Sequence, residues 1–133
     1  MKKVNVYIEL AGNGYSAYMD KNDLDYGLIG EGKTVDETIA DFKSTYEAMR
    51  SYYHSVNKPF EEAEFVFYYD IASFLEEYSK AFSLAGLERI TGIRQAQLGH
   101  YLHGRSKPTR KTIARIQKGI QAFADKLSSV QFA

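Results

Sequence analysis

The sequence contains no cysteine, which excludes a disulfide framework and any metal site built on thiolates. It also lacks a charged-then-apolar opening segment of the kind that directs secretion, and no apolar run approaches the roughly 18 residues of a membrane span. Internal repeats, low-complexity segments and a Ser/Gly/Pro-rich linker are absent as well. We therefore expect a soluble, cytoplasmic protein whose parts follow one another without a flexible connection.

The composition is that of a soluble globular chain, with 133 residues of which 44% are hydrophobic and 26% are charged. This length allows one or two small domains that bury roughly two thirds of the surface of the unfolded chain. The net charge of zero hides an uneven distribution, because residues 1–72 carry 7 Lys/Arg against 13 Asp/Glu and residues 73–133 carry 10 against 4. Such an asymmetry indicates a different partner for each half.

The first third of the chain has the pattern of short strands. Apolar and polar residues alternate over residues 4–10, and Gly12-Asn13-Gly14 predicts a hairpin turn into a returning strand over residues 15–19. Alternation over residues 24–28 predicts a third short strand, closed by Gly30-Glu31-Gly32. These strands predict a small sheet.

A long helix follows over residues 35–54, where apolar residues recur at steps of three and four. Thr34 and Glu37 form a capping box at its start, and Pro59 follows its end. A fourth strand over residues 65–69 comes after this crossover, so we expect it to run parallel to one of the first three. The sequence thus predicts an α+β domain over residues 1–70.

Eleven Tyr and eight Phe are more aromatic residues than a core of this size needs. Several tyrosines are therefore expected to be partly exposed, either as an interaction surface or merely as a cover for the outer face of the sheet. The exposed residues are expected to include some of Tyr7, Tyr15, Tyr18, Tyr52, Tyr53 and Tyr68.

Residues 71–133 are expected to form an all-α bundle of about four helices. Asp70 is placed to cap the first helix, and two short helices over residues 83–91 and 94–103 are joined at Gly92. Thr109 is placed to cap a last helix with an apolar stripe. The stripe consists of Ile113, Ile116, Ile120, Phe123 and Leu127. Two short helices joined at a glycine turn predict a helix-turn-helix.

The second of these short helices has a polar face suited to base edges. If Leu98, Tyr101 and Leu102 face the bundle, the outward residues expected to contact bases are Arg94, Gln95, Ala96 and His100. The residues expected to contact phosphates are Gln97, Arg105, Ser106, Lys107 and Arg110, although Gln97 is also placed to brace the turn. The alternative is the solvated face of an ordinary helical bundle.

Metal binding and catalysis find little support in the sequence. His100 and His103 are three residues apart, but a third ligand for a metal ion is missing. Among the carboxylates of the N-terminal half only Glu9 lies on a predicted strand in a suitable position, and no nucleophile motif frames the serines. We expect neither enzymatic activity nor a cofactor or metal, with a nuclease as the remaining alternative.

The segment 84–123 resembles the Cro/repressor-like (XRE) helix-turn-helix family. The resemblance lies in Thr91-Gly92-Ile93, Gln95-x-x-Leu98, Tyr101-Leu102-His103-Gly104 and Lys107-Pro108. It implies that Gln95, Ala96 and His100 face the bases and that the segment after Gly104 meets phosphates. Two residues depart from the family pattern: Glu88 stands where a small residue is usual, and Arg94 where a Ser or Thr cap is usual.

The N-terminal half is similar to the antitoxin domain of HicB-type proteins, in which strands are followed by a glycine, a Thr-x-x-Glu cap and a long helix. Here these are residues 30–42 and the later strand 65–69, while residues 25–30 replace the usual Pro-Asp-x-Pro-Gly turn. The resemblance implies a reduced RNase H-like fold without catalytic carboxylates. Its partner would be a small, basic, HicA-like toxin that cleaves RNA, and the toxin-contacting residues are not identifiable from the sequence.

Together the two resemblances imply an antitoxin that neutralises its toxin and represses its own operon by binding double-stranded operator DNA. We expect a dimer or tetramer, because two-fold symmetry doubles the DNA contacts of a small helix-turn-helix. The N-terminal sheet and the last helix are the candidate oligomer surfaces. The alternative function is a stand-alone XRE-type regulator whose N-terminal domain senses a ligand or dimerises.

Overall fold

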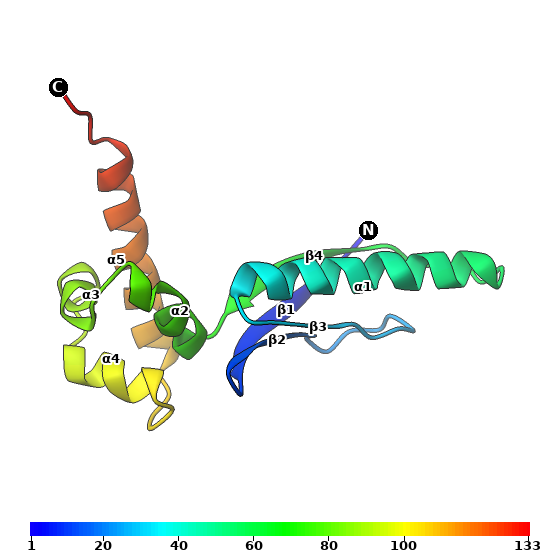
Figure 1. Ribbon diagram of the computed structural model, residues 1–133, viewed down its shortest axis with the longest axis horizontal. Helices are drawn as coiled ribbons and strands as arrows, with labels where there is room; N and C mark the ends of the chain where they lie inside the picture. Colours follow the sequence, from blue (N-terminus) through cyan, green and yellow to red (C-terminus); the bar gives the residue numbers. More distant parts are fainter. The chain divides into compact units, whose positions relative to one another are not determined.

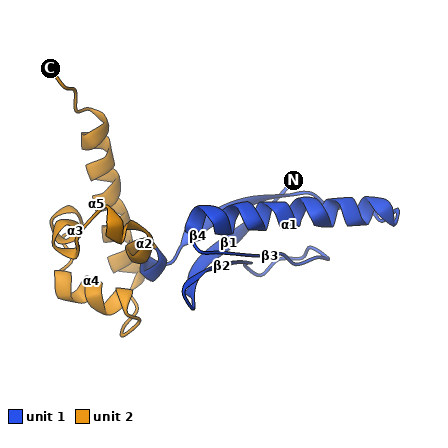
Figure 2. Ribbon diagram, viewed as in Figure 1, with its two compact units in different colours: residues 1–73 blue, residues 74–133 orange.

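The computed structural model describes all 133 residues, which form an α+β protein of two units, residues 1–73 and 74–133 (Figure 2). The first unit contains a four-stranded sheet and a long helix, and the second unit is helical (Figure 1). The division falls between Ser73 and Phe74, three residues beyond the position 70 at which the sequence places it.

The sheet has the strand order β3-β2-β1-β4. Its strands are β1 (Lys2–Ala11), β2 (Gly14–Met19), β3 (Ile29–Gly32) and β4 (Ala63–Tyr69). The pairs β1–β2 and β2–β3 are antiparallel, whereas β4 lies parallel to β1 as the crossover predicts. Gly12, at φ +61°, supplies the left-handed backbone of the hairpin turn.

Helix α1 (Val35–Ser55) begins where the capping motif predicts. The Thr34 hydroxyl accepts a hydrogen bond from the Glu37 N–H at 3.1 Å. The Glu37 carboxylate reaches one residue further back than in a standard capping box, because it accepts from the Lys33 N–H at 3.0 Å. Both side chains therefore occupy backbone donors at the helix start, as expected.

The predicted third strand over residues 24–28 is wrong. That segment is an irregular loop, and the strand is formed by residues 29–32, which include the Gly30-Glu31-Gly32 segment expected only to close it. The reason is the contact with α1: a Cβ on Gly30 would lie 2.6 Å from the Thr38 carbonyl oxygen, and one on Gly32 would lie 2.7 Å from the Thr38 nitrogen. Only glycine lets β3 approach the helix backbone so closely.

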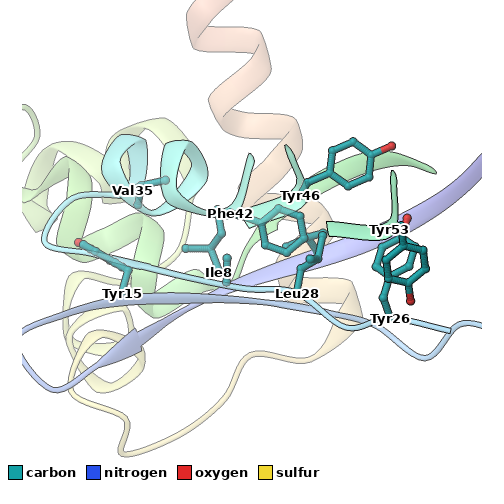
Figure 3. Packing of buried hydrophobic residues seen from close by; sticks show 10 residues of the cluster. Ile8, Tyr15, Tyr26, Leu28, Val35, Phe42, Tyr46 and Tyr53 are labelled. Atoms are coloured by element: carbon teal, nitrogen blue, oxygen red, sulfur yellow. The ribbon is translucent and has the colours of Figure 1, made fainter. Parts of the chain in front are cut away.

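The core of unit 1 lies between the sheet and α1 (Figure 3). Phe42 is fully buried, with its ring edge-on to Phe65 at 5.0 Å and to Phe67 at 5.5 Å between centroids. Tyr15 and Tyr53 are also buried, so the exposed members of the six candidate tyrosines are Tyr18, Tyr52 and Tyr68. Other buried members of this cluster are Val6, Ile8, Ala17, Tyr26, Leu28, Val35 and Tyr46.

Unit 2 contains the four helices that the sequence predicts. They are α2 (Ile71–Glu77), which starts in unit 1 and continues into the short 3₁₀ helix η1 (Tyr78–Lys80), then α3 (Leu84–Thr91), α4 (Gln95–Leu102) and α5 (Arg110–Ser128). Asp70 caps α2 by accepting from the Ser73 N–H at 2.8 Å, and Thr109 caps α5 by accepting from the Thr112 N–H at 3.2 Å. Helix α3 packs against both α4 and α5.

Close packing of α3 on α5 depends on Gly119. A Cβ at this position would lie 2.5 Å from the carbonyl oxygen of Ile90. The two helix backbones therefore meet without a side chain between them, as at the contact of β3 with α1. None of the five helices has both the length and the apolar character needed to cross a membrane.

Candidate nucleic-acid interface

The connection between α3 and α4 is a short turn that begins at Gly92. This residue ends α3 in the left-handed conformation, at φ 76°, and its N–H donates to the Glu88 carbonyl. The Thr91 hydroxyl donates to the Leu87 carbonyl at 2.7 Å and accepts from the Ile93 N–H at 3.2 Å. The Arg115 guanidinium donates to the Gly92 carbonyl at 3.2 Å. The turn is thus held from α3 on one side and from α5 on the other.

The start of α4 is capped from α3. Arg94 occupies the N-cap position, and its side chain makes no capping hydrogen bond. Instead, the carboxylate of Glu88 accepts from the Gln95 N–H at 2.6 Å. The two departures from the repressor-like pattern are therefore linked, because the acidic residue at 88 supplies the acceptor that position 94 lacks.

The faces of α4 are arranged as the apolar spacing predicts. Leu98 and Tyr101 are buried, and Leu102 is half-buried. The residues expected to read bases are all exposed: Arg94, Gln95, Ala96 and His100. Their exposure leaves one polar face of α4 open, while their contact with bases stays a prediction.

The segment between α4 and α5 presents most of the residues expected to bind phosphates. Gly104, at φ 71°, reverses the chain, and the Arg105 N–H donates to the His100 carbonyl at 2.9 Å. Gln97 donates to the Ser106 hydroxyl at 3.4 Å, so it ties the first turn of α4 to this segment by a side-chain contact. Arg105, Lys107 and Arg110 are exposed, and Ser106 is half-buried.

A run of basic residues without any acid extends from the end of α3 through α4 into α5. Residues 89–124 contain eight Lys/Arg and no Asp or Glu. All eight are exposed and none forms an ion pair, whereas every ion pair of the protein lies in unit 1. We call these residues the basic run: Arg89, Arg94, Arg105, Lys107, Arg110, Lys111, Arg115 and Lys118. Unpaired cations gathered near an exposed helix are typical of a nucleic-acid interface.

Four members of the basic run were not among the predicted site residues: Arg89, Lys111, Arg115 and Lys118. The prediction followed only the outward face of α4 and the segment just after it. The missing signal was the absence of acidic residues over 36 positions, which the sequence shows without any knowledge of the fold. Arg115 has a second role that was not foreseeable, because its contact with Gly92 depends on how α5 packs.

The two histidines of this region have no further metal ligands beside them. His100 and His103 flank the end of α4, and the protein contains no group of three or more His, Asp or Glu residues positioned to hold a metal ion. Comparisons with known proteins found no matching family model, curated protein or solved structure. The resemblances to repressor-like and HicB-type proteins therefore rest on the sequence motifs quoted above.

Proposed function

We propose that this protein is a DNA-binding antitoxin that represses its own operon. In this proposal α3 and α4 form a helix-turn-helix, and α4 enters the major groove of double-stranded operator DNA. The observation that carries the proposal is the basic run, whose eight exposed cations have no acidic partner within the protein. Phosphates are the counter-charges that such a surface binds.

Two kinds of contact are proposed at the DNA. Gln95 and Arg94 are exposed on α4, and their two-pronged side chains match the edges of adenine and guanine. Lys107 and Arg110 lie in the segment that leads into α5, where they would neutralise phosphates on the flanking backbone. The first pair would give sequence specificity, and the second would give affinity for any DNA.

For unit 1 we propose a reduced RNase H-like domain that binds a small, basic, RNA-cleaving toxin. Residues 1–73 carry 13 Asp/Glu against 7 Lys/Arg, and only five of those 13 carboxylates form ion pairs, which leaves eight outside any ion pair. An acidic surface attracts a basic protein and repels DNA, so the two activities are assigned to different units. This unit is proposed to act by binding and not by catalysis.

A homodimer is proposed to form through unit 2. The apolar stripe of α5 recurs at alternating steps of three and four, the spacing of a helix–helix seam. Only Ile116 of this stripe is buried, and Leu127 is 58% exposed. The stripe borders an apolar groove of about 240 Å³, lined by Phe74, Tyr78, Phe82, Leu87, Ile90, Ile120, Phe123, Ala124 and Leu127. A second copy seated there would give two α4 helices for two half-sites.

The DNA activity is tested by measuring binding to the region upstream of the gene and to a shuffled sequence of equal length. We expect tight binding to the first and weaker binding to the second, with both falling steeply between about 50 and about 200 mM salt. Salt-independent binding, or no preference between the two sequences, would contradict a role for the basic run in operator recognition.

The antitoxin activity is tested by co-expression with a small basic protein encoded beside the gene. We expect growth arrest by that protein alone and rescue by this protein, with a complex that survives moderate salt. Specific DNA binding without rescue would favour the alternative, a stand-alone repressor-like regulator. Cleavage of labelled RNA by the purified protein with Mg²⁺ would favour a nuclease.

A further inference from the structure

The sheet of unit 1 has one face against α1 and a second face that unit 1 leaves uncovered (Figure 1). Residues in register across all four strands form a row on this second face. Tyr68 pairs with Tyr7, Tyr7 with Tyr18, and Tyr18 with Ile29. We call this set, which consists of three tyrosines and Ile29 at the β3 edge, the aromatic row. Tyr7 is half-buried, whereas Tyr68, Tyr18 and Ile29 are 47%, 37% and 62% exposed.

The rings of the aromatic row are held in place. The Tyr7 ring lies 5.9 Å from the Tyr18 ring and 6.0 Å from the Tyr68 ring, measured between centroids. The Tyr18 hydroxyl donates to the Glu9 carboxylate at 2.7 Å, and the Tyr7 hydroxyl donates to Asp20 at 3.3 Å. The bond to Glu9, together with burial, raises the pKa of Tyr18 to about 12, so this hydroxyl stays protonated. A preformed aromatic surface loses little entropy on binding.

The charge beside the aromatic row is negative. Glu9 and Glu31 are both exposed and lie on the same face, since each is in register with Ser16 between them. Neither carboxylate forms an ion pair. On the β4 side, Glu64 is in register with Lys3, which carries the opposite charge. Glu9 and Glu31 have no basic residue in register, so the excess negative charge lies on the β1–β2–β3 side of this face.

This combination favours one kind of occupant. DNA, RNA and acidic membranes would be repelled by Glu9 and Glu31, and a second copy of the same face would bring like charges together. Arginine suits both features, because its planar guanidinium stacks on a tyrosine ring and also binds a carboxylate through two hydrogen bonds. Ile29, at the edge of the row, adds apolar contact area.

We propose that the aromatic row, together with Glu9 and Glu31, docks an arginine-bearing surface of a basic protein. The inference rests on the proposed function in one respect, since the toxin would be that basic protein. It goes further in assigning the contact to the uncovered face of the sheet and not to α1, although α1 also carries exposed acidic residues such as Asp36 and Glu47.

The surface is tested first with a defined probe, an arginine-rich synthetic peptide, titrated into the isotope-labelled full chain and followed by NMR. We expect shift changes at the outward residues of β1 to β4, and binding weakened about threefold or more by Tyr68→Ala or Glu9→Gln. The matched control is Tyr52→Ala, which removes a 60% exposed tyrosine of α1. Shift changes centred on α1, or equal losses in all three variants, would overturn the proposal.

The second test uses growth rescue against the toxin. Ile29→Arg and Tyr68→Arg should abolish rescue while leaving operator binding unchanged, and Tyr52→Arg should still rescue. Rescue by Ile29→Arg and Tyr68→Arg would overturn the assignment of the surface. Failure of the unmodified protein to rescue would count against the antitoxin function alone, and the peptide titration then decides the surface independently.

Discussion

Glu88 sets the start of α4 although it belongs to α3, because its carboxylate accepts the Gln95 N–H at 2.6 Å. In Glu88→Ala the first turn of α4 would lose its side-chain acceptor, and water would have to take its place. We expect unit 2 to be destabilised by about 1 kcal/mol, the usual cost of losing an N-cap. Denaturant unfolding of the wild type and the variant measures this cost.

Arg94 offers the matched control for that change. The double variant Glu88→Ala/Arg94→Ser places an acceptor at the N-cap position itself and should recover most of the lost stability. A double variant as unstable as Glu88→Ala would show that Glu88 acts through some contact other than the cap.

In the proposed complex with DNA, Gln95 would contribute sequence specificity and Lys107 would contribute affinity for any DNA. Gln95→Ala should cost about 1–3 kcal/mol on the operator and almost nothing on shuffled DNA. Lys107→Ala should weaken binding to both sequences alike and lower the slope of the salt dependence by about 1. Anisotropy titrations at several salt concentrations distinguish the two patterns, and equal losses on both sequences for both variants would contradict the proposed roles.

Residues whose partners are close in the chain were predictable. Thr34, Asp70 and Thr109 each cap a backbone N–H three residues ahead, so their roles follow from local spacing. Glu88 is different, since it reaches an N–H seven residues ahead across a turn whose shape depends on Gly92 and Arg115. The sequence marked positions 88 and 94 as unusual, but only the geometry shows that they compensate each other.

At the scale of elements, β3 depends on two glycines because it lies against the backbone of α1. In Gly30→Ala the new methyl group would meet the Thr38 carbonyl oxygen at 2.6 Å and the Phe42 Cβ at 2.7 Å. We expect a loss of about 1–3 kcal/mol in unfolding free energy, as in other overpacked sites. The control is Gly27→Ala, where no atom lies within 4 Å of the new methyl group, and its stability should be almost unchanged.

Two ion pairs attach the loop before β3 to the rest of unit 1. The stability of the protein should therefore depend on pH in the acidic range. The Lys58 ammonium lowers the pKa of Asp25, and the Lys2 ammonium lowers the pKa of Asp23, both from a usual value of 3.8. Because the pKa of each carboxyl is lower in the folded protein than its usual 3.8, its ion pair stabilises the fold fully above pH 3.8. This stabilisation is lost as the pH falls through the lowered pKa values of the folded protein. The double variant Asp23→Asn/Asp25→Asn should therefore show a smaller drop in melting temperature between about pH 4 and about pH 2.

The long elements were predictable and the short irregular one was not. Helix α1 and the hairpin β1–β2 follow from period and turn chemistry that act within the segment itself. The loop over residues 20–28 has strand-like alternation, yet Tyr26 and Leu28 are buried there without strand pairing. Burial alone produces such alternation. From the sequence, Gly30 and Gly32 indicate the end of a strand. Their actual role, which is to let β3 approach α1, depends on a helix that comes later in the chain.

For the molecule as a whole, the proposed dimer predicts that α5 controls both assembly and DNA affinity. Leu127→Asp would place a charge on a 58% exposed seam position without disturbing the core. We expect the dimer to weaken by about 2 kcal/mol or more, which is about thirtyfold or more in dissociation constant. Sedimentation at several concentrations measures this shift, and operator binding should fall with it.

Ala122→Asp is the control, because it adds the same charge to an exposed position off the apolar stripe of the same helix. It should leave the dimer unchanged. A monomeric wild type, or equal weakening of the dimer by Leu127→Asp and Ala122→Asp, would contradict the proposed dimer interface along the apolar stripe of α5.

Charge segregation was the whole-molecule property that the sequence predicted best. Counting charges needs no fold, and the structure adds that ion pairs occur in unit 1 alone. The surfaces were harder to foresee. The aromatic row exists only because the register aligns residues from four strands, and the groove of unit 2 is lined by residues that are far apart in the sequence, from Phe74 to Leu127.

Helix α2 begins in unit 1 and ends in unit 2. Its position limits where the chain can be divided into separate fragments. The carbonyl of Ile8 accepts from both the Asp70 N–H and the Ser73 hydroxyl, each at 3.1 Å, so the first turn of α2 completes the sheet. A fragment that stops at residue 70 would keep the Asp70 N–H but lose the Ser73 hydroxyl, and with it one of the two hydrogen bonds to that carbonyl. Recombination between related genes would face the same limit: a crossover that exchanges unit 2 for that of another protein has to fall downstream of Ser73, inside a helix and not in a loop.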